Sequence, residues 1–336
     1  MKSCVVIPTL NACDLLAEAL ASLETQTTRT GVVVVDNAST DGTREMLATR
    51  FPSVELVTID RNLGFGNAVN RGVAAVPTDT DVVVLVNNDV VCEPEFVERM
   101  VAPFADERVG MVAGVLLQGS APTLVDSAGI ELDSTMRSYD ALWNAPVAAV
   151  STAPAPIGPC GGAAAYRMSV FRDLGGFDPI FFAYWEDVDL ALRLQDAGWQ
   201  CARAPAARAL HRHGQTLGAG SPEGRTLDAF GRGFVLGRYR VGDRRPLTRA
   251  AIALVDWPAL LVHLVARREI APLRARARGI REGRSRPALR APTELATVTV
   301  REAVARQWRF VALRLTGRAP RHFSETEGRQ PAERRS

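Results

Sequence analysis

Short apolar runs alternate with segments of helical period through about the first ninety residues, and this alternation constrains the fold most strongly. Four of these runs have only the length of a buried strand: 4–8, 32–35, 54–58 and 81–86. Between them, apolar residues follow a helical period over 14–25, and helices are also predicted over 43–49 and 66–75. Buried strands separated by helices predict an α/β fold with a largely parallel sheet that is covered by helices on both faces.

The rest of the chain divides into a mixed region and a basic C-terminal region. The mixed region is predicted to form strands over 109–117 and 163–167, helices over 169–174 and 187–197, and a loop over 145–159. Beyond residue 235, amphipathic segments rich in arginine predict helices, and the last residues have the composition of a disordered end. The chain is therefore expected to have three parts: an α/β domain over 1–235, a basic amphipathic helical region over 236–316 and a disordered tail over 317–336.

Charge is distributed unevenly between these parts. The net charge of the chain is +3, but residues 237–336 contain 23 arginines, no lysine and nine acidic residues, a net charge of +14. The preceding 236 residues therefore carry a net charge of −11. A basic region of this kind is typical of contact with an anionic partner, such as a membrane surface or a nucleic acid. Nucleic acid is disfavoured, because no motif of interleaved aromatic and basic residues accompanies the arginines.

We expect no transmembrane helix, because a bilayer span requires about 20 apolar residues. The longest apolar run, 251–265, is about 15 residues long and is interrupted by Asp256, Pro258 and His263. Residues 2–10 have the pattern of a strand rather than that of a signal peptide. The five cysteines are scattered and form no CxxC pair, so we expect free thiols and a cytoplasmic protein.

Polar side chains follow the predicted strands at the points where the strands end. Thr9 follows the first strand, Asp36 follows the second, and Asn87-Asn88-Asp89 follows the fourth. Ligands bind outside the carboxyl ends of the strands in an open parallel sheet, so these clusters predict a binding site at one edge. Asp and Asn are also common in turns, but the convergence of several clusters on one edge favours a site.

The loop after the first strand excludes two common nucleotide-binding classes. A dinucleotide-binding fold requires G-x-G-x-x-G in that loop, whereas this chain has PTLNAC over 8–13. The sequence Gly64-Phe-Gly66 follows a different strand and lacks the third glycine, and no Walker A sequence occurs. The chain is therefore not expected to transfer hydride with NAD or to hydrolyse nucleotides at a P-loop.

A series of short motifs occurs in a fixed order along residues 3–216, nearly two thirds of the chain. After the opening strand, the motifs are VDNASTDG (35–42), NLGFGNAVNRG (62–72), LVNND (85–89), GGA (161–163), GGFD (175–178), WEDVDLALR (185–193) and HRHGQT (211–216). Together they resemble the inverting glycosyltransferases of family 2, in particular their bacterial rhamnosyltransferase-like branch. The resemblance implies the GT-A fold, with a Rossmann-like, mostly parallel sheet, and a nucleotide-sugar-binding catalytic domain over 1–235.

By this resemblance, residues 87–89 occupy the family's DxD position, where a carboxylate helps to hold a divalent cation on the donor diphosphate. Asn87 replaces the first aspartate, so Asp89 supplies the carboxylate and His211 the second ligand to Mg²⁺ or Mn²⁺. Asp36 is implied to accept the N3–H of a pyrimidine base, an edge that uracil and thymine share. The other residues implied to contact the donor are Thr9, Asn37, Asp41, Asn62, Gly64, Gly66, Asn67 and Asn88.

The resemblance places the catalytic base in the acidic segment that begins at Glu186, and we assign it to Asp187, with Glu186 beside it. A positioned carboxylate contributes about 10²–10⁴-fold as a general base. Gly161, Gly162 and Trp185 are implied to contact the acceptor. A single displacement with one base implies inversion at the anomeric carbon.

The implied activity is transfer of a sugar from a nucleotide diphosphate to a hydroxyl of a glycan or polyprenyl-linked acceptor. dTDP-L-rhamnose is the favoured donor, ahead of UDP-sugars. A sugar nucleotidyltransferase and a non-catalytic nucleotide-sugar-binding protein are the alternatives. The basic region is expected to dock the enzyme on the anionic inner face of the plasma membrane, or else to pack on the catalytic domain or form a homo-oligomer interface.

Overall fold

The computed structural model describes residues 1–212, 221–241, 246–261, 264, 267–289, 298–299, 301–302 and 304–305. The strands are β1 (Ser3–Thr9), β2 (Gly31–Asp36), β3 (Glu55–Thr58), β4 (Val82–Val86), β5 (Val90–Cys92), β6 (Val109–Gln118), β7 (Ala121–Ser127), β8 (Ile130–Leu132), β9 (Ser138–Asp140), β10 (Ala163–Arg167) and β11 (Gln200–His211). The α-helices are α1 (Cys13–Glu24), α2 (Thr43–Arg50), α3 (Phe65–Ala75), α4 (Phe96–Val101), α5 (Met168–Asp173), α6 (Glu186–Asp196), α7 (Pro222–Arg238), α8 (Pro246–Leu261) and α9 (Ala271–Ser285).

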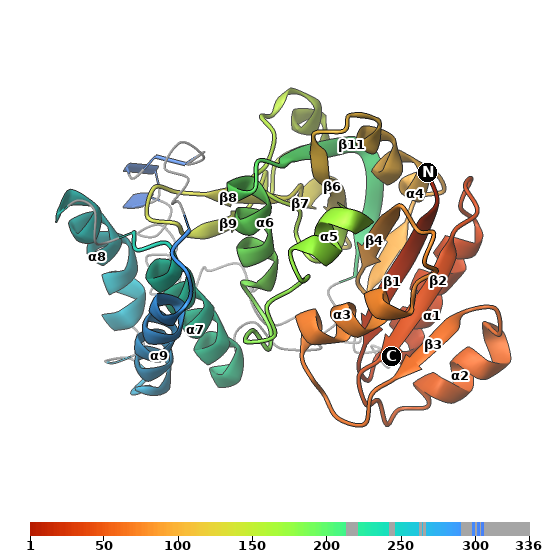
Figure 1. Ribbon diagram of the computed structural model, residues 1–336, viewed down its shortest axis with the longest axis horizontal. Coiled ribbons are helices and arrows are strands. Elements are labelled where there is room, and N and C mark those ends of the chain that lie inside the picture. The colour runs from red at the N-terminus through yellow and green to blue at the C-terminus, as the bar shows by residue number, and fades with distance from the viewer. Residues whose placement is uncertain are drawn as a thin grey trace, which may run out of the picture.

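Nine of the described strands form one sheet in the order β3-β2-β1-β4-β10-β6-β11-β5, with β7 paired to β6 (Figure 1). The first four strands are parallel, as the alternation of apolar runs and helices predicted. Alternate residues of β1 point to opposite faces, where Val5 and Ile7 pack with α1 and Val6 packs with α3. Helices α1, α2 and α4 thus cover one face of the sheet, and α3, α5 and α6 cover the other.

Beyond β4 the sheet is mixed, because β11 runs parallel to β6 whereas the other pairs are antiparallel. β10 lies antiparallel between β4 and β6, and the short β5 pairs antiparallel with the end of β11, where Val90 lies opposite His211. Because β5 begins directly after residues 87–89, this pairing brings Asp89 beside His211. The segment expected to be a loop, 145–159, contains a 3-10 helix over Val147–Thr152.

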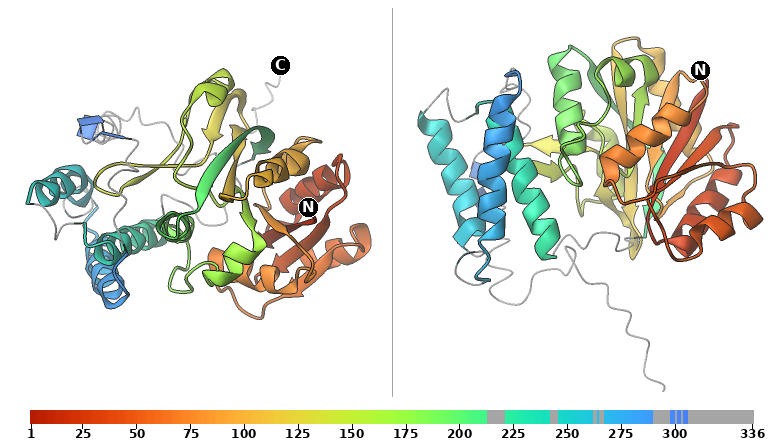
Figure 2. Two further views of the ribbon diagram at one scale, coloured as in Figure 1. Left: turned by 45° about the horizontal axis from the view of Figure 1, so that its top comes forward. Right: turned by 60° about the horizontal axis from the view of Figure 1, so that its bottom comes forward.

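Helices α7 and α9 pack together with glycines at their contact, on the side of the molecule away from β3 (Figure 2). A Cβ added to Gly279 would lie 2.1 Å from the carbonyl oxygen of Phe230, and one added to Gly233 would lie 2.2 Å from that of Arg276. The two backbones can approach so closely only because these positions carry no side chain. The boundary expected at residue 235 falls inside α7, so the helical region begins earlier than expected.

The C-terminal helices pack on the α/β body through α6 and the segment before it. The Trp185 indole, at the residue before α6, donates a hydrogen bond of 2.8 Å to Asp228 on α7. Phe181 and Phe234 stack edge to face with ring centroids 4.9 Å apart. None of the described helices combines the length and apolar character that a bilayer span requires. All five cysteines are free, as expected, and the tail expected to be disordered, 317–336, lies outside the described residues.

Candidate active site

The loop between β3 and α3 is shaped by two asparagines that follow different strands. Asn37 Nδ2 donates to Asn62 Oδ1 at 2.8 Å, and Asn37 Oδ1 accepts the backbone N–H of Leu63 at 2.9 Å. Asn62 Oδ1 also accepts the N–H of Gly64 at 2.9 Å. Gly64 has φ of +82°, and a Cβ there would lie 1.9 Å from the Phe182 carbonyl oxygen. Glycine is therefore required at this position, because a segment from far along the chain closes over it.

The ends of β1, β2 and β4 hold three of the predicted donor-binding residues, Thr9, Asp36 and Asn88. Asp36 is completely buried, and its carboxylate accepts the N–H of Ser39 at 2.9 Å and pairs with Arg44. Thr9 accepts a hydrogen bond of 3.0 Å from Asn88 Nδ2, which joins the ends of β1 and β4. These contacts confirm that residues distant in sequence converge at the carboxyl edge of the parallel strands.

Asp41 anchors the starts of two helices. Its carboxylate accepts the N–H of Cys13, the first residue of α1, at 2.9 Å, and the hydroxyl of Thr43, the first residue of α2, at 2.5 Å. Desolvation alone would raise the pKa of Asp41, but these hydrogen bonds lower it. The described hydrogen bonds of this predicted donor-binding residue are thus structural.

A histidine lies between two carboxylates at the end of β11. His211 Nε2 is 3.4 Å from Asp89 Oδ2, and Nδ1 is 2.6 Å from Asp126 Oδ2 on β7. Desolvation alone would lower the pKa of His211, but hydrogen bonds to Asp126 and Asp89, together with their charges, raise it to about 10. No group of three or more His, Cys, Asp or Glu side chains within the described part of the chain has the arrangement of a complete metal site.

Two adjacent carboxylates stand at the start of α6 and face different surroundings. Asp187 Oδ2 accepts the N–H of Gly161 at 3.1 Å, and Oδ1 accepts that of Val188 at 2.8 Å. Glu186 is only 6% exposed, and its Oε2 has no hydrogen-bond partner among the described residues. Desolvation and then the charge of Asp187 raise the pKa of Glu186, while desolvation raises that of Asp187 against its backbone hydrogen bonds.

Glycines allow three separate segments to meet around these carboxylates. A Cβ on Gly66 would lie 3.4 Å from Glu186 Cγ, so the start of α3 packs directly on Glu186. A Cβ on Gly161 would lie 3.1 Å from the Phe65 ring and 3.9 Å from Asp187 Oδ2. Gly162 similarly leaves room for Leu116 and Asn87. Asn67 ties the same loop to the segment before α6, donating to the carbonyls of Leu63, Pro179 and Phe181.

Trp185 does not form an open wall beside these residues. It is 7% exposed, adopts φ of +75° and packs against Gly231 of α7, where a Cβ would lie 2.5 Å from the indole. Most of the indole surface is therefore covered by α7 rather than available to an acceptor.

Sequence reasoning missed two carboxylates of this region. Asp126 holds Nδ1 of His211, and Asp140, at the end of β9, lies within reach of the charges of Asp126, Asp187 and His211. Neither residue belongs to a motif, and the only sequence signal is that each lies in a short strand-like stretch of the mixed region.

Comparison with known proteins assigns the chain to a family. Glycosyl transferase family 2 matches residues 4–175, just over half of the chain. An N-acetylglucosaminyl-diphospho-decaprenol L-rhamnosyltransferase of Mycobacterium tuberculosis is 33% identical over 227 residues, which cover 60% of this chain and 73% of the relative. The O-antigen chain rhamnosyltransferase RfbN of Salmonella typhimurium is 27% identical over 223 residues, which cover 64% and 68%.

A solved structure shares the fold. The mannosyltransferase PcManGT from Pyrobaculum calidifontis, in complex with GDP-Man and Mn²⁺, superposes with a TM-score of 0.52 over 96% of this chain and 84% of its own, at 19% identity. The fold is therefore that of the GT-A glycosyltransferases. The chain belongs to glycosyl transferase family 2, within which it is similar to bacterial rhamnosyltransferases, and it is an enzyme of sugar transfer.

Proposed function

We propose that this protein transfers a sugar, with inversion, from a nucleotide diphosphate to a hydroxyl group of a lipid-linked or cell-wall glycan. dTDP-L-rhamnose is the first donor to test, since two relatives are named as rhamnosyltransferases, and UDP-sugars follow. The observation that carries the proposal is the position of Asp187. Its carboxylate lies at the start of α6 against the Gly161 backbone. The charge of Asp187 and that of His211, the partner of Asp89, both act on Asp140.

In the proposed reaction, Asp187 takes the proton of the acceptor hydroxyl as the hydroxyl oxygen attacks the anomeric carbon. The bond between that carbon and the diphosphate oxygen breaks, and the nucleoside diphosphate leaves with the bonding electron pair. Attack from the face opposite the leaving group inverts the configuration at the anomeric carbon. Backbone hydrogen bonds from Gly161 and Val188 hold both oxygens of Asp187 and so orient its carboxylate for this proton transfer.

The residues beside β5 fit a divalent cation that would displace the Nε2 proton which Asp89 and Asp126 stabilise on His211. His211 offers Nε2 toward Asp89 while Asp126 holds Nδ1, which is the carboxylate–histidine arrangement that orients metal-binding imidazoles. Asp89 and His211 would hold Mn²⁺ or Mg²⁺, with the donor diphosphate completing the ligand set. Such a cation would neutralise the charge that develops on the departing diphosphate.

The donor would lie along the carboxyl ends of β1, β2 and β4. Asp36 would receive the pyrimidine N3–H, and this contact would compete with the existing pair between Asp36 and Arg44. Thr9 and Asn88 would bind beside the base and ribose. The loop shaped by Asn37, Asn62 and Gly64 would lie against the sugar nucleotide, with Asp41, Gly66 and Asn67 supporting it. Gly161 and Gly162 would form the floor beneath the acceptor.

The proposal is tested by a screen of dTDP- and UDP-sugars for donor hydrolysis and transfer, with Mn²⁺ and with Mg²⁺. Asp187→Asn should bind donor with unchanged affinity yet lose about 10²-fold or more in turnover, because the amide accepts no proton. Asp89→Ala should weaken donor binding in the presence of the cation. Asp106→Asn, in an exposed pair with Arg108, is the matched control and should behave as wild type. Unchanged turnover in Asp187→Asn would remove this residue from the mechanism.

A non-catalytic donor-binding protein is the alternative that Asn87 raises, because the first carboxylate of the DxD position is missing. It predicts donor binding without turnover for every sugar nucleotide in the screen. Family membership disfavours the other alternative, a sugar nucleotidyltransferase.

We further propose peripheral docking on an anionic bilayer at the inner face of the plasma membrane. Four arginines of α9 are exposed: Arg274, Arg278, Arg281 and Arg284. Exposed apolar side chains lie on α8 and between α8 and α9: Leu254, Leu264 and Ile270. Basic and apolar side chains together favour the surface of an anionic membrane.

Docking is tested by sedimentation with vesicles of phosphatidylcholine, with and without phosphatidylglycerol. The protein should pellet with the anionic vesicles, and the double variant Arg278→Gln/Arg281→Gln should lose most of this binding. Arg99→Gln, an exposed arginine on α4, is the control and should pellet like wild type. Equal recovery in the supernatant with both kinds of vesicle would contradict docking.

A further inference from the structure

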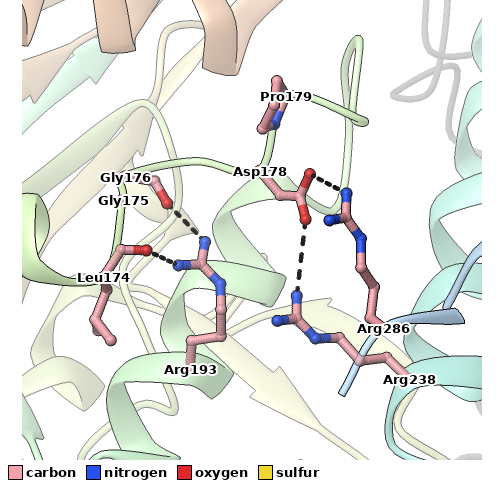
Figure 3. A pocket seen from close by; sticks show the side chains of 8 residues that line it. All are labelled: Leu174, Gly175, Gly176, Asp178, Pro179, Arg193, Arg238 and Arg286. Carbon is pink, nitrogen blue, oxygen red and sulfur yellow. Dashed lines mark hydrogen bonds and ion pairs between the residues drawn. The ribbon is translucent and has the colours of Figure 1, made fainter. Parts of the chain in front are cut away.

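A pocket of about 220 Å³ lies outside the proposed active site, between the turn after α5, helix α6 and the C-terminal ends of α7 and α9 (Figure 3). Three of its lining residues are arginines from separate elements. Arg193 belongs to α6, Arg238 is the last residue of α7, and Arg286 directly follows α9. Segments far apart in the sequence thus bring three guanidinium groups to one hollow.

Positive charge is in excess at this pocket. Asp178 is the one carboxylate among the lining residues, and Asp189 lies completely buried behind them. Asp189 accepts hydrogen bonds of 2.7 Å from both Arg193 and Arg238, and Asp178 pairs with Arg286 at 3.2 Å. Three guanidinium groups therefore face two carboxylates, which leaves one uncompensated positive charge.

The three arginines differ in how many of their guanidinium N–H groups already donate to an acceptor. Arg193 is held on three sides by Asp189 and by the carbonyls of Leu174 and Gly176, so it acts as a fixed wall and a source of charge. Arg238 keeps a buried Nε with no hydrogen-bond partner among the described residues. Arg286 is 43% exposed at the rim of the pocket. A buried guanidinium N–H without an acceptor is unfavourable, so an added acceptor at Arg238 would stabilise the structure.

We propose that this pocket binds a phosphate or diphosphate group. Guanidinium forks match the oxygens of phosphate better than those of any other common anion except carboxylate, and charge-assisted bonds of this kind are strong. The anion would replace Asp178 as the partner of Arg286 and of Arg238. The guanidinium nitrogens of these arginines lie 3.2 and 3.9 Å from the Asp178 carboxylate oxygens, the longest ion-pair distances in the cluster. The short bond between Arg238 and Asp189 would remain.

Binding at the pocket would be transmitted to the proposed donor loop. Asp178 begins the segment that continues to Phe182, whose carbonyl accepts the N–H of Phe65 at 2.9 Å. The carbonyl of Pro179, also in this segment, accepts from Asn67 Nδ2 at 3.3 Å. One short segment therefore forms the wall of the pocket at one end and clamps the start of α3 at the other. An anion that replaces Asp178 at its arginine partners would release that end of the segment and so change how firmly the segment holds the start of α3.

The test is calorimetric titration of the full chain with pyrophosphate at 150 mM salt. Excess EDTA and an Asp89→Ala background remove the contribution of the proposed donor site, which also recognises a diphosphate. We expect saturable binding at one site, weakened about tenfold or more by Arg286→Gln. Arg99→Gln, an exposed arginine on α4 that does not line the pocket, should bind like the background protein. Absence of saturable binding, or equal affinity in both variants, would overturn the proposal.

A further variant excludes a folding defect as the cause. Arg238→Lys keeps the charge beside Asp189 but removes the guanidinium fork, and it should weaken pyrophosphate binding while retaining the melting temperature of the background protein. Unweakened binding in Arg238→Lys would count against a role for this residue and against the pocket as assigned.

Two sources supply such a group, a free diphosphate and the headgroup of a polyprenyl diphosphate. Phosphatidylcholine vesicles that contain a few per cent of a polyprenyl diphosphate distinguish them. Capture by these vesicles that Arg286→Gln abolishes and Arg99→Gln preserves identifies the headgroup, whereas binding of soluble pyrophosphate alone identifies the free anion. Either result supports the pocket. The result is independent of the proposed transfer reaction, which is tested separately with Asp187→Asn.

Discussion

At the scale of single residues, two neighbouring carboxylates at one helix start have opposite surroundings. Asp187 is held by two backbone N–H groups, whereas Glu186 is buried against Gly66 and keeps an oxygen without a partner in the described structure. Burial and the neighbouring charge disfavour ionisation of Glu186. Burial raises the pKa of both carboxyl groups, so the pair keeps a proton above the usual pH range of carboxylates. The two backbone N–H groups that donate to Asp187 favour its ionised form, which is the form that the proposed base requires.

This arrangement predicts how stability depends on pH. The folded protein keeps the proton of Glu186 at a pH where the unfolded chain, with a glutamate pKa of about 4.3, has released it. The free energy of unfolding should therefore fall as pH rises above about 5, until the folded-state pKa is passed. Glu186→Gln should reduce this fall, to which the raised pKa of His211 also contributes above about pH 6.5, and should be more stable than wild type at pH 8. The midpoints of urea denaturation at pH 5 and pH 8 measure this change in the free energy of unfolding for both proteins.

The matched control for this prediction is Glu45→Gln, at an exposed position on α2. It should leave the pH dependence of the urea midpoint as in wild type. A wild-type midpoint that rises between pH 5 and pH 8, or a fall that persists unchanged in Glu186→Gln, would show that Glu186 is ionised in the folded protein.

Asp126 is a positioning residue for His211. Its bond of 2.6 Å to Nδ1 directs Nε2 toward Asp89, and loss of such a partner typically lowers metal affinity about 10–100-fold. Asp126→Ala should therefore reduce Mn²⁺ affinity by about tenfold or more, as measured by electron paramagnetic resonance of free Mn²⁺. Asp106→Ala, an exposed aspartate, should leave the affinity unchanged. Equal Mn²⁺ affinities in Asp126→Ala and wild type would show that His211 needs no such support.

At the scale of secondary structure elements, the contact between α7 and α9 depends on positions without side chains. A Cβ added to Gly279 or to Gly283 on α9 would lie 2.1 Å from a backbone carbonyl oxygen of α7. Gly279→Ala must push the helices apart and should lower the free energy of unfolding by about 1–3 kcal/mol. Urea denaturation measures this loss. Ala277→Ser adds one heavy atom at an exposed position of α9 and should be nearly neutral, so similar effects of the two substitutions would refute this packing.

At the scale of the whole molecule, the C-terminal helices are part of the catalytic unit rather than an appendage. Asp189 on α6 pairs with Arg238 on α7, and Trp185 is covered by α7. A chain that ends at residue 220 would expose Trp185 and Phe181 and leave the start of α6 unsupported. It should lose cooperative thermal unfolding and all transfer activity.

The control for this truncation is a chain that ends at residue 316, which removes only the tail expected to be disordered. This shorter deletion should keep both the thermal transition and the activity. Full activity of the chain that ends at residue 220 would show that α7 and α9 do not support α6.

The sequence predicted much of the fold and part of the arrangement of the site. The strands and helices of the first hundred residues were predictable because each depends on its own apolar period, and the carboxyl edge followed from parallel pairing. The contact between Asp89 and His211 came from resemblance alone, since it depends on β5 turning back to pair with β11. The roles assigned to the site residues stay predictions.

What the sequence by itself determined was the alternation of strands and helices, the two apolar faces of the sheet and the family motifs, because these are properties of neighbouring residues. Only the tertiary structure decided that Asp126 supports His211, that Trp185 faces α7 and that three arginines line one pocket. These contacts join residues from about 40 to 90 positions apart, and their energies depend on distances that no local pattern encodes.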